Sequence, residues 1–85
     1  MLDTIEKDVL ERLTFEEKLD HLLEEVNEPR PVVIDVLKGL LTKDMVQAYS
    51  FDENTGKATP TPFYDSDNMG EFMYRITTKG LDALY

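Results

Sequence analysis

Two parts of the sequence contain side chains that commonly transfer protons or bind metal ions. His21 is the only histidine, and acid–base chemistry would require an orienting partner and a pocket. It falls off the apolar stripe of its predicted helix, so we interpret it as a solvated residue. Residues 65–70 begin like a calcium loop, but Met69 occupies the fifth position and Ile76 stands where a bidentate glutamate is needed. We therefore predict a polar turn there, and no enzyme activity, metal site or cofactor.

Acidic residues dominate the chain and gather near its beginning. The sequence has 18 Asp and Glu against 9 Lys and Arg, for a formal charge of −9. Residues 1–28 contain most of this excess, and an acidic surface of that kind repels DNA and anionic membranes. The one net-basic stretch is residues 29–43, which contains three basic residues, Arg30, Lys38 and Lys43, and one acidic residue, Asp35.

Length and composition predict one domain over residues 1–85. Hydrophobic residues are 41% of the chain, enough for one small core. No stretch approaches the roughly 20 apolar residues of a membrane-spanning helix, and no signal peptide opens the chain. The sequence has no cysteine, which suits a reducing compartment, so we expect a cytoplasmic protein.

Apolar spacing predicts two helices at the start of the chain. The first covers residues 3–13, with Asp3 and Glu6 as a capping box. Thr14 and Glu17 have the same spacing, so we predict that a second helix begins at Thr14. Its apolar stripe contains Leu19, Leu22, Leu23 and Val26, with Phe15 one turn earlier.

A third helix is predicted over residues 31–43. Pro31 suits a first helical turn, and Asp44 tolerates the left-handed conformation that often ends a helix. At helical spacing, the inward face contains Val33, Val36, Leu37 and Leu40. The outward stripe contains Pro31, Ile34, Asp35, Lys38 and Thr42.

The rest of the sequence predicts two strands and a last helix. The strands cover residues 45–51 and 72–76. Thr77 is expected to cap a helix over residues 78–85, with Leu81 and Leu84 facing inward.

A long loop, residues 52–71, is predicted between these strands. Residues 52–57 form a turn, and residues 58–62 are extended but pair poorly because their two prolines lack a donor. Phe63 and Tyr64 either fold back over the sheet or form an exposed tip that binds a partner.

The predicted order of helices and strands is that of a winged helix-turn-helix domain. Residues 37–46, Leu-Lys-Gly-Leu-Leu-Thr-Lys-Asp-Met-Val, resemble the end of that family's recognition helix and its exit into the wing. Residues 74–81, Tyr-Arg-Ile-Thr-Thr-Lys-Gly-Leu, resemble the return strand of the wing. The chain looks most like the small PadR- and MarR-type regulators. This resemblance predicts a mainly α fold with a small antiparallel β-hairpin, an α+β domain.

The resemblance implies a dimeric transcriptional regulator whose third helix lies in the major groove of DNA and whose wing touches the backbone or minor groove. On this hypothesis the DNA-contacting residues are Arg30, Val32, Ile34, Asp35, Lys38, Thr42, Lys43 and Lys57. The chain departs from the family in its acidic wing and in its outward stripe, which lacks the arginine, asparagine and glutamine that read bases best. In addition, Asp44 replaces a usual glycine, and the last helix ends at Tyr85, whereas dimeric members often extend it.

Two functions of different class therefore stay open. The first is a small DNA-binding regulator that contacts duplex DNA through residues 31–43. The second is a winged-helix module for protein–protein interaction, or an acidic DNA mimic, that does not bind DNA itself. The candidate partner-binding residues lie in the wing and on the first helix, whose stripe could also pair with a second copy to form a homodimer. They are Phe63, Tyr64, Leu2, Ile5 and Val9.

Overall fold

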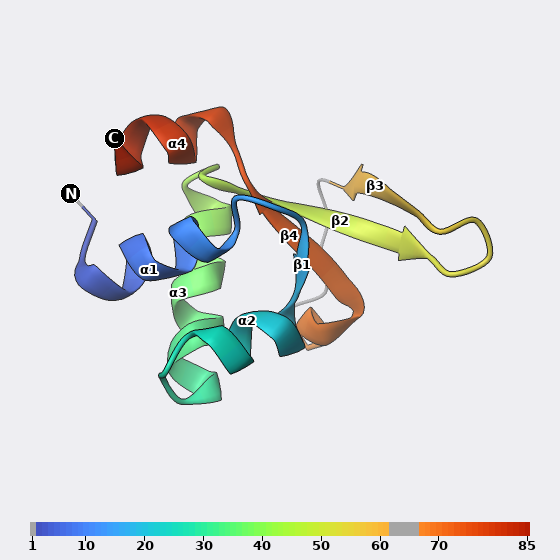
Figure 1. Ribbon diagram of the computed structural model, residues 1–85, viewed down its shortest axis with the longest axis horizontal. Coiled ribbons are helices and arrows are strands. Elements are labelled where there is room, and N and C mark those ends of the chain that lie inside the picture. Colours follow the sequence, from blue (N-terminus) through green and yellow to red (C-terminus); the bar gives the residue numbers. More distant parts are fainter. Residues whose placement is uncertain (1, 62–66) are drawn as a thin grey trace.

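The computed structural model describes residues 2–61 and 67–85, which form an α+β arrangement (Figure 1). Within these residues there are four α-helices, a short 3₁₀ helix and one antiparallel sheet of four strands. In chain order the elements are α1 (Thr4–Arg12), β1 (Glu17–Lys18), α2 (Leu19–Glu25), α3 (Arg30–Thr42), β2 (Val46–Asp52), β3 (Lys57–Thr61), η1 (Met69–Glu71), β4 (Phe72–Ile76) and α4 (Thr78–Leu84). The predicted α+β class is confirmed, and the sheet is larger than the predicted hairpin.

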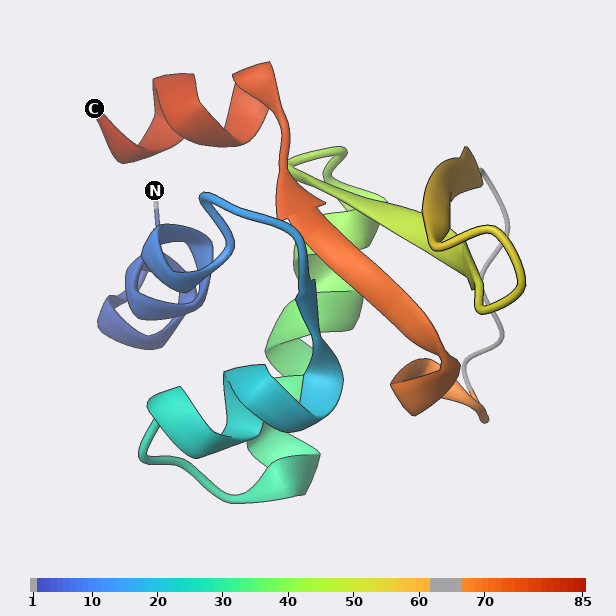
Figure 2. The same cartoon turned by 45° about the vertical axis from the view of Figure 1, so that its right-hand side comes forward.

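The four strands are arranged in the order β1-β4-β2-β3, so the central pair is β2 and β4. In this pair Val46 lies opposite Ile76 and Ala48 lies opposite Tyr74, and all four side chains are buried. Residues directly opposite in antiparallel strands share a face. Helices α1, α2 and α3 gather on one side of the sheet (Figure 2), and the core lies between the helices and this inner face.

Helix α1 forms as predicted: a capping box stabilises its start, and its apolar stripe is buried. The Asp3 side chain accepts the Glu6 N–H at 2.8 Å, and the Glu6 side chain accepts the Asp3 N–H at 3.1 Å. These bonds satisfy amides that the first helical turn leaves without partners. The apolar stripe then enters the core through Val9, Leu10 and Leu13, which are fully buried.

The predicted start of the second helix at Thr14 is wrong. The Thr14 hydroxyl instead donates to the Glu11 carbonyl at 2.8 Å, and Phe15 is 76% exposed. Glu17 and Lys18 form strand β1 against β4, and the helix begins only at Leu19. The edge of β4 offers backbone partners to this segment, and pairing with it replaces the local capping box.

Helix α3 lies within one residue of its predicted ends. Pro31 occupies the first turn, and Val33, Leu37 and Leu40 are fully buried. The helix is followed by Asp44, whose φ of 63° is left-handed. This conformation reverses the chain toward β2, as we predicted from the tolerance of aspartate for positive φ.

Strand β3 corrects the prediction that residues 58–62 pair poorly. Residues 57–61 pair with β2 in a regular hairpin, and Pro60 lies opposite Tyr49. Because β3 is an edge strand, a proline is tolerated there. The Gln47 side chain adds to the pairing by donating to the Thr61 carbonyl at 2.8 Å. Phe63 and Tyr64, predicted either to fold back over the sheet or to form an exposed tip, lie outside the described residues.

Helix α4 is anchored at its start and only partly buried beyond it. Thr77 caps the helix by accepting the Gly80 N–H, and its hydroxyl donates to the Asp44 carbonyl at 2.7 Å. Leu84 packs against the core, as predicted. Leu81 is 38% exposed, so its predicted inward orientation is wrong.

Candidate nucleic-acid interface

The candidate interface is the outward side of α3, which its own buried side positions. Val33, Leu37 and Leu40 seat this helix in the core with α1, α2 and the sheet. The opposite side is partly exposed to solvent. Its exposed residues are Arg30, Pro31, Asp35 and Thr42, and its half-buried ones are Ile34 and Lys38.

Arg30, Ile34 and Lys38 are spaced four residues apart, so they form one stripe along α3. Neither Arg30 nor Lys38 forms an ion pair with a residue in the described part of the chain. These two cations are thus available for phosphate. Asp35 lies beside the stripe and lowers its net positive charge.

Lys43, predicted to contact DNA, is occupied by another partner. Its ammonium Nζ lies 3.1 Å from Glu6 Oε2, at the start of α1. Thr42 is engaged in a similar way, because its hydroxyl donates to the Lys38 carbonyl at 2.9 Å. The end of α3 is therefore tied to α1 and to its own backbone.

Val32 and Lys57 lie apart from the stripe. Val32 lines a hollow of about 330 Å³ between α1 and α3 together with three carboxylates, those of Asp3, Glu6 and Asp35. Lys57 is exposed at the start of β3, in the hairpin that extends away from the helices (Figure 1). Arg30, Ile34, Lys38 and Thr42 thus lie along one side of α3 with Asp35 beside them, whereas Val32 and Lys57 lie apart.

The candidate partner-binding residues divide in the same way. Val9 is fully buried, so the prediction that it binds a partner is wrong: its side chain fills the core of its own chain. Leu2 and Ile5 are half-buried against that core. Phe63 and Tyr64 lie outside the described residues.

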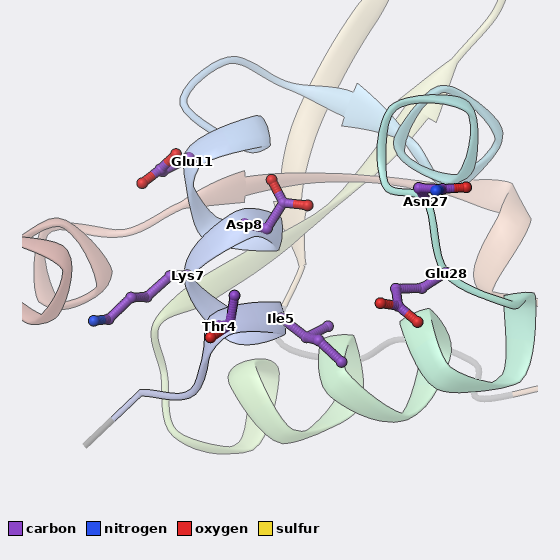
Figure 3. A pocket seen from close by; sticks show the side chains of 7 residues that line it. All are labelled: Thr4, Ile5, Lys7, Asp8, Glu11, Asn27 and Glu28. Carbon is purple, nitrogen blue, oxygen red and sulfur yellow. The ribbon is translucent and has the colours of Figure 1, made fainter.

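Ile5 borders a second acidic hollow, of about 560 Å³, between α1 and the loop before α3 (Figure 3). Asp8, Glu11 and Glu28 supply carboxylates to it, and Lys7 supplies one cation. No group of three His, Asp or Glu side chains in residues 2–61 and 67–85 is placed to hold a metal ion. The hollow is an acidic surface without the geometry of a metal centre.

His21 lies on the surface of α2, as its position off the apolar stripe predicts. Its side chain is 67% exposed, and Nδ1 lies 3.3 Å from Glu17 Oε2. It lines neither acidic hollow.

The calcium-like stretch, residues 65–70, falls partly outside the described residues, and Met69 within it is buried in the core.

Three further cations were missed by the sequence reasoning. Lys18 lies over the Phe51 ring at 5.2 Å, Arg75 is exposed on β4, and Lys79 is exposed on α4. The alternation of residues 72–76 could have placed Arg75 on the outer face of the sheet. Lys18 could not be placed in this way, because its strand was not predicted.

The described helices are too short or too polar to span a membrane. Comparison with protein-family models, with curated proteins and with solved structures finds no match for this chain.

Proposed function

We propose that this chain is a winged-helix protein that binds duplex DNA through α3. The supporting observation is a stripe of Arg30, which is exposed, and Ile34 and Lys38, which are half-buried, on a helix whose opposite side is seated in the core. A rigid helix with one free face has the diameter to enter the major groove. The order α1-β1-α2-α3, followed by the β2–β3 hairpin, the return strand β4 and α4, supports the same assignment.

Each residue of the stripe has a distinct role in this proposal. Arg30 and Lys38 bind phosphates and set the position of the helix on DNA. Ile34 provides an apolar contact for a thymine methyl group, and the Asp35 carboxylate can accept a hydrogen bond from a cytosine amino group. The stripe therefore combines positioning by two cations with base contacts by their neighbours.

Binding is expected to be weak and steeply dependent on salt. Arg30, Lys38 and Lys57 are the free cations among the proposed contacts, and each phosphate neutralised contributes about −0.9 to the slope of log K against log salt. We expect a slope of roughly −2 to −3 on this basis. The formal charge of −9 further opposes approach to DNA.

The proposal is tested by titrating a fluorescent duplex at low salt. Lys38→Glu should abolish binding, whereas Lys7→Glu makes the same charge change on the exposed side of α1 and should reduce affinity only slightly. Both side chains are outside the core, so both variants should fold. Binding that is absent for the parent chain, or equally sensitive to the two substitutions, would refute the proposal.

A second candidate function is a protein-interaction module that does not bind DNA. The observation that favours it is the Glu6–Lys43 ion pair, which engages one of the three cations in residues 29–43. The carboxylates of Asp3 and Asp35 lie in the adjoining hollow. A parent chain that binds no duplex at low salt would support this function over the first.

A further inference from the structure

A groove of about 440 Å³ lies where the outer face of the sheet meets α4. Gln47 lies opposite Arg75 in the β2–β4 pair, and Tyr49 lies opposite Pro60 in the β2–β3 pair. These four residues alternate with the buried ones, so they share the face that α1, α2 and α3 leave uncovered. Ile76 and Thr77, at the end of β4, and Thr78 and Leu81 of α4 complete the lining.

The charge of this groove is opposite to that of the two acidic hollows. The hollow beside Ile5 and the hollow beside Val32 are each lined by three carboxylates. Among the residues that the structure describes, the lining of the β2–β4–α4 groove includes no carboxylate and one guanidinium, that of Arg75. Arg75 is exposed and forms no ion pair with any residue the structure describes. In a chain of charge −9, the groove is thus a local site for a negative group.

Apolar and polar side chains both line the groove beside this cation. Leu81 is 38% exposed, Tyr49 is half-buried and Pro60 is exposed. The Gln47 amide is already engaged, because it donates to the carbonyls of Ala48 and Thr61. Arginine and tyrosine are both enriched at the centres of protein–protein interfaces.

We propose that this groove binds a segment of a partner protein in which a carboxylate lies beside a hydrophobic side chain. The carboxylate pairs with the Arg75 guanidinium through charge-assisted hydrogen bonds. The hydrophobic side chain packs against Tyr49 and Leu81. Nucleic acid fits less well, because a single cation neutralises too few phosphates. The inference is independent of DNA binding, because no α3 residue lines the groove.

The test uses a short fluorescein-labelled peptide in which glutamates alternate with leucine and phenylalanine. We expect it to bind at physiological salt and to shift the backbone amide NMR signals of Tyr49, Arg75 and Leu81. The net charge of the chain repels this peptide at long range, so binding requires a local complementary site. A peptide with lysines in place of the glutamates should leave these three signals unchanged.

Matched variants separate the groove from the rest of the surface. Arg75→Glu should weaken peptide binding at least tenfold, and Leu81→Ser should also weaken it. Arg30→Glu makes the same charge change on α3 and should leave the affinity within about twofold. All three side chains are exposed, and thermal unfolding checks that each variant is folded.

Four outcomes would overturn the proposal. In the first two, the acidic peptide does not bind, or it shifts the NMR signals of residues outside the groove. In the third, Arg75→Glu and Arg30→Glu reduce the affinity for the peptide equally. In the fourth, the lysine peptide shifts the signals of Tyr49, Arg75 and Leu81. Single-stranded DNA that shifts the groove signals at lower concentration than the acidic peptide would assign the groove to nucleic acid instead.

Discussion

Glu6 and Lys43 join the start of α1 to the end of α3, with Nζ and Oε2 3.1 Å apart. The other oxygen of the same carboxylate accepts the Asp3 N–H and completes the cap of α1. One side chain therefore both stabilises a helix start and neutralises a cation of the proposed DNA-binding helix.

Glu6→Gln should separate these two roles. The amide oxygen can still accept the Asp3 N–H, but the negative charge is lost and Lys43 is released. We expect duplex DNA to bind a few-fold more tightly at low salt. The free energy of unfolding should fall by less than about 1 kcal/mol, because Lys43 is half exposed and solvent screens the pair.

The control for this prediction is Glu24→Gln, which removes the same charge from the exposed side of α2. Duplex titration and urea unfolding of both variants provide the measurements. An equal gain in affinity from the two substitutions would mean that net charge, and not the release of Lys43, is responsible.

Gly80→Ala should destabilise the fold strongly for a change of one methyl group. A Cβ at this position would overlap the Met45 carbonyl oxygen and Ile76 Cγ1. Because backbone must move to relieve this overlap, we expect a loss of about 1–3 kcal/mol in urea unfolding. Gly39→Ala in α3 is the matched control, since no neighbouring atom lies within 4 Å of its Cβ position. That variant should gain up to about 1 kcal/mol from helix propensity.

Asp44→Gly should stabilise the protein by about 0.5–1 kcal/mol, because glycine adopts positive φ without a steric penalty. The φ of Asp44 is 63°, and its carbonyl, not its side chain, accepts the Thr77 hydroxyl. Asp44→Val should instead be destabilising, because a β-branched residue is disfavoured at positive φ. Thermal unfolding of the two variants checks this order, and the reverse order would contradict the assigned conformation.

Leu37→Ala should reduce the free energy of unfolding by about 2–5 kcal/mol, because it leaves a cavity in a fully buried part of the core. Leu81→Ala removes the same atoms from a side chain that is 38% exposed. Its cost should stay below about 1 kcal/mol. Chemical denaturation of the two variants measures the difference, and similar losses would show that α4 packs more tightly than described.

Helices α1 and α3 were predictable because their signals are local. The capping box of Asp3 and Glu6 and the apolar period of Val33, Leu37 and Leu40 specify helix within a few turns of sequence. Pro31 and Asp44 mark the limits of α3 for equally local reasons. The same spacing predicted an outward stripe of Pro31, Ile34, Asp35, Lys38 and Thr42, of which Ile34 and Lys38 are half-buried and the rest exposed.

The two outer strands were not predictable because pairing partners, and not local preference, form them. Glu17 and Lys18 are extended only because Met73 and Tyr74 lie beside them in the fold. The engagement of Lys43 by Glu6 is a long-range effect of the same kind. Periodicity identifies the face on which a side chain lies, but not the group that it meets there.

The two borders of the sheet also bear on how this protein meets other copies of itself. β1 is only two residues long, and β3 contains Pro60, which supplies no N–H. A strand from another copy that paired with β1 could form only a few hydrogen bonds, and one that paired with β3 would lack a donor at Pro60. Edge-to-edge association of the sheets of several copies is therefore disfavoured, although β2 and β4 alone would offer long and regular strands for such pairing.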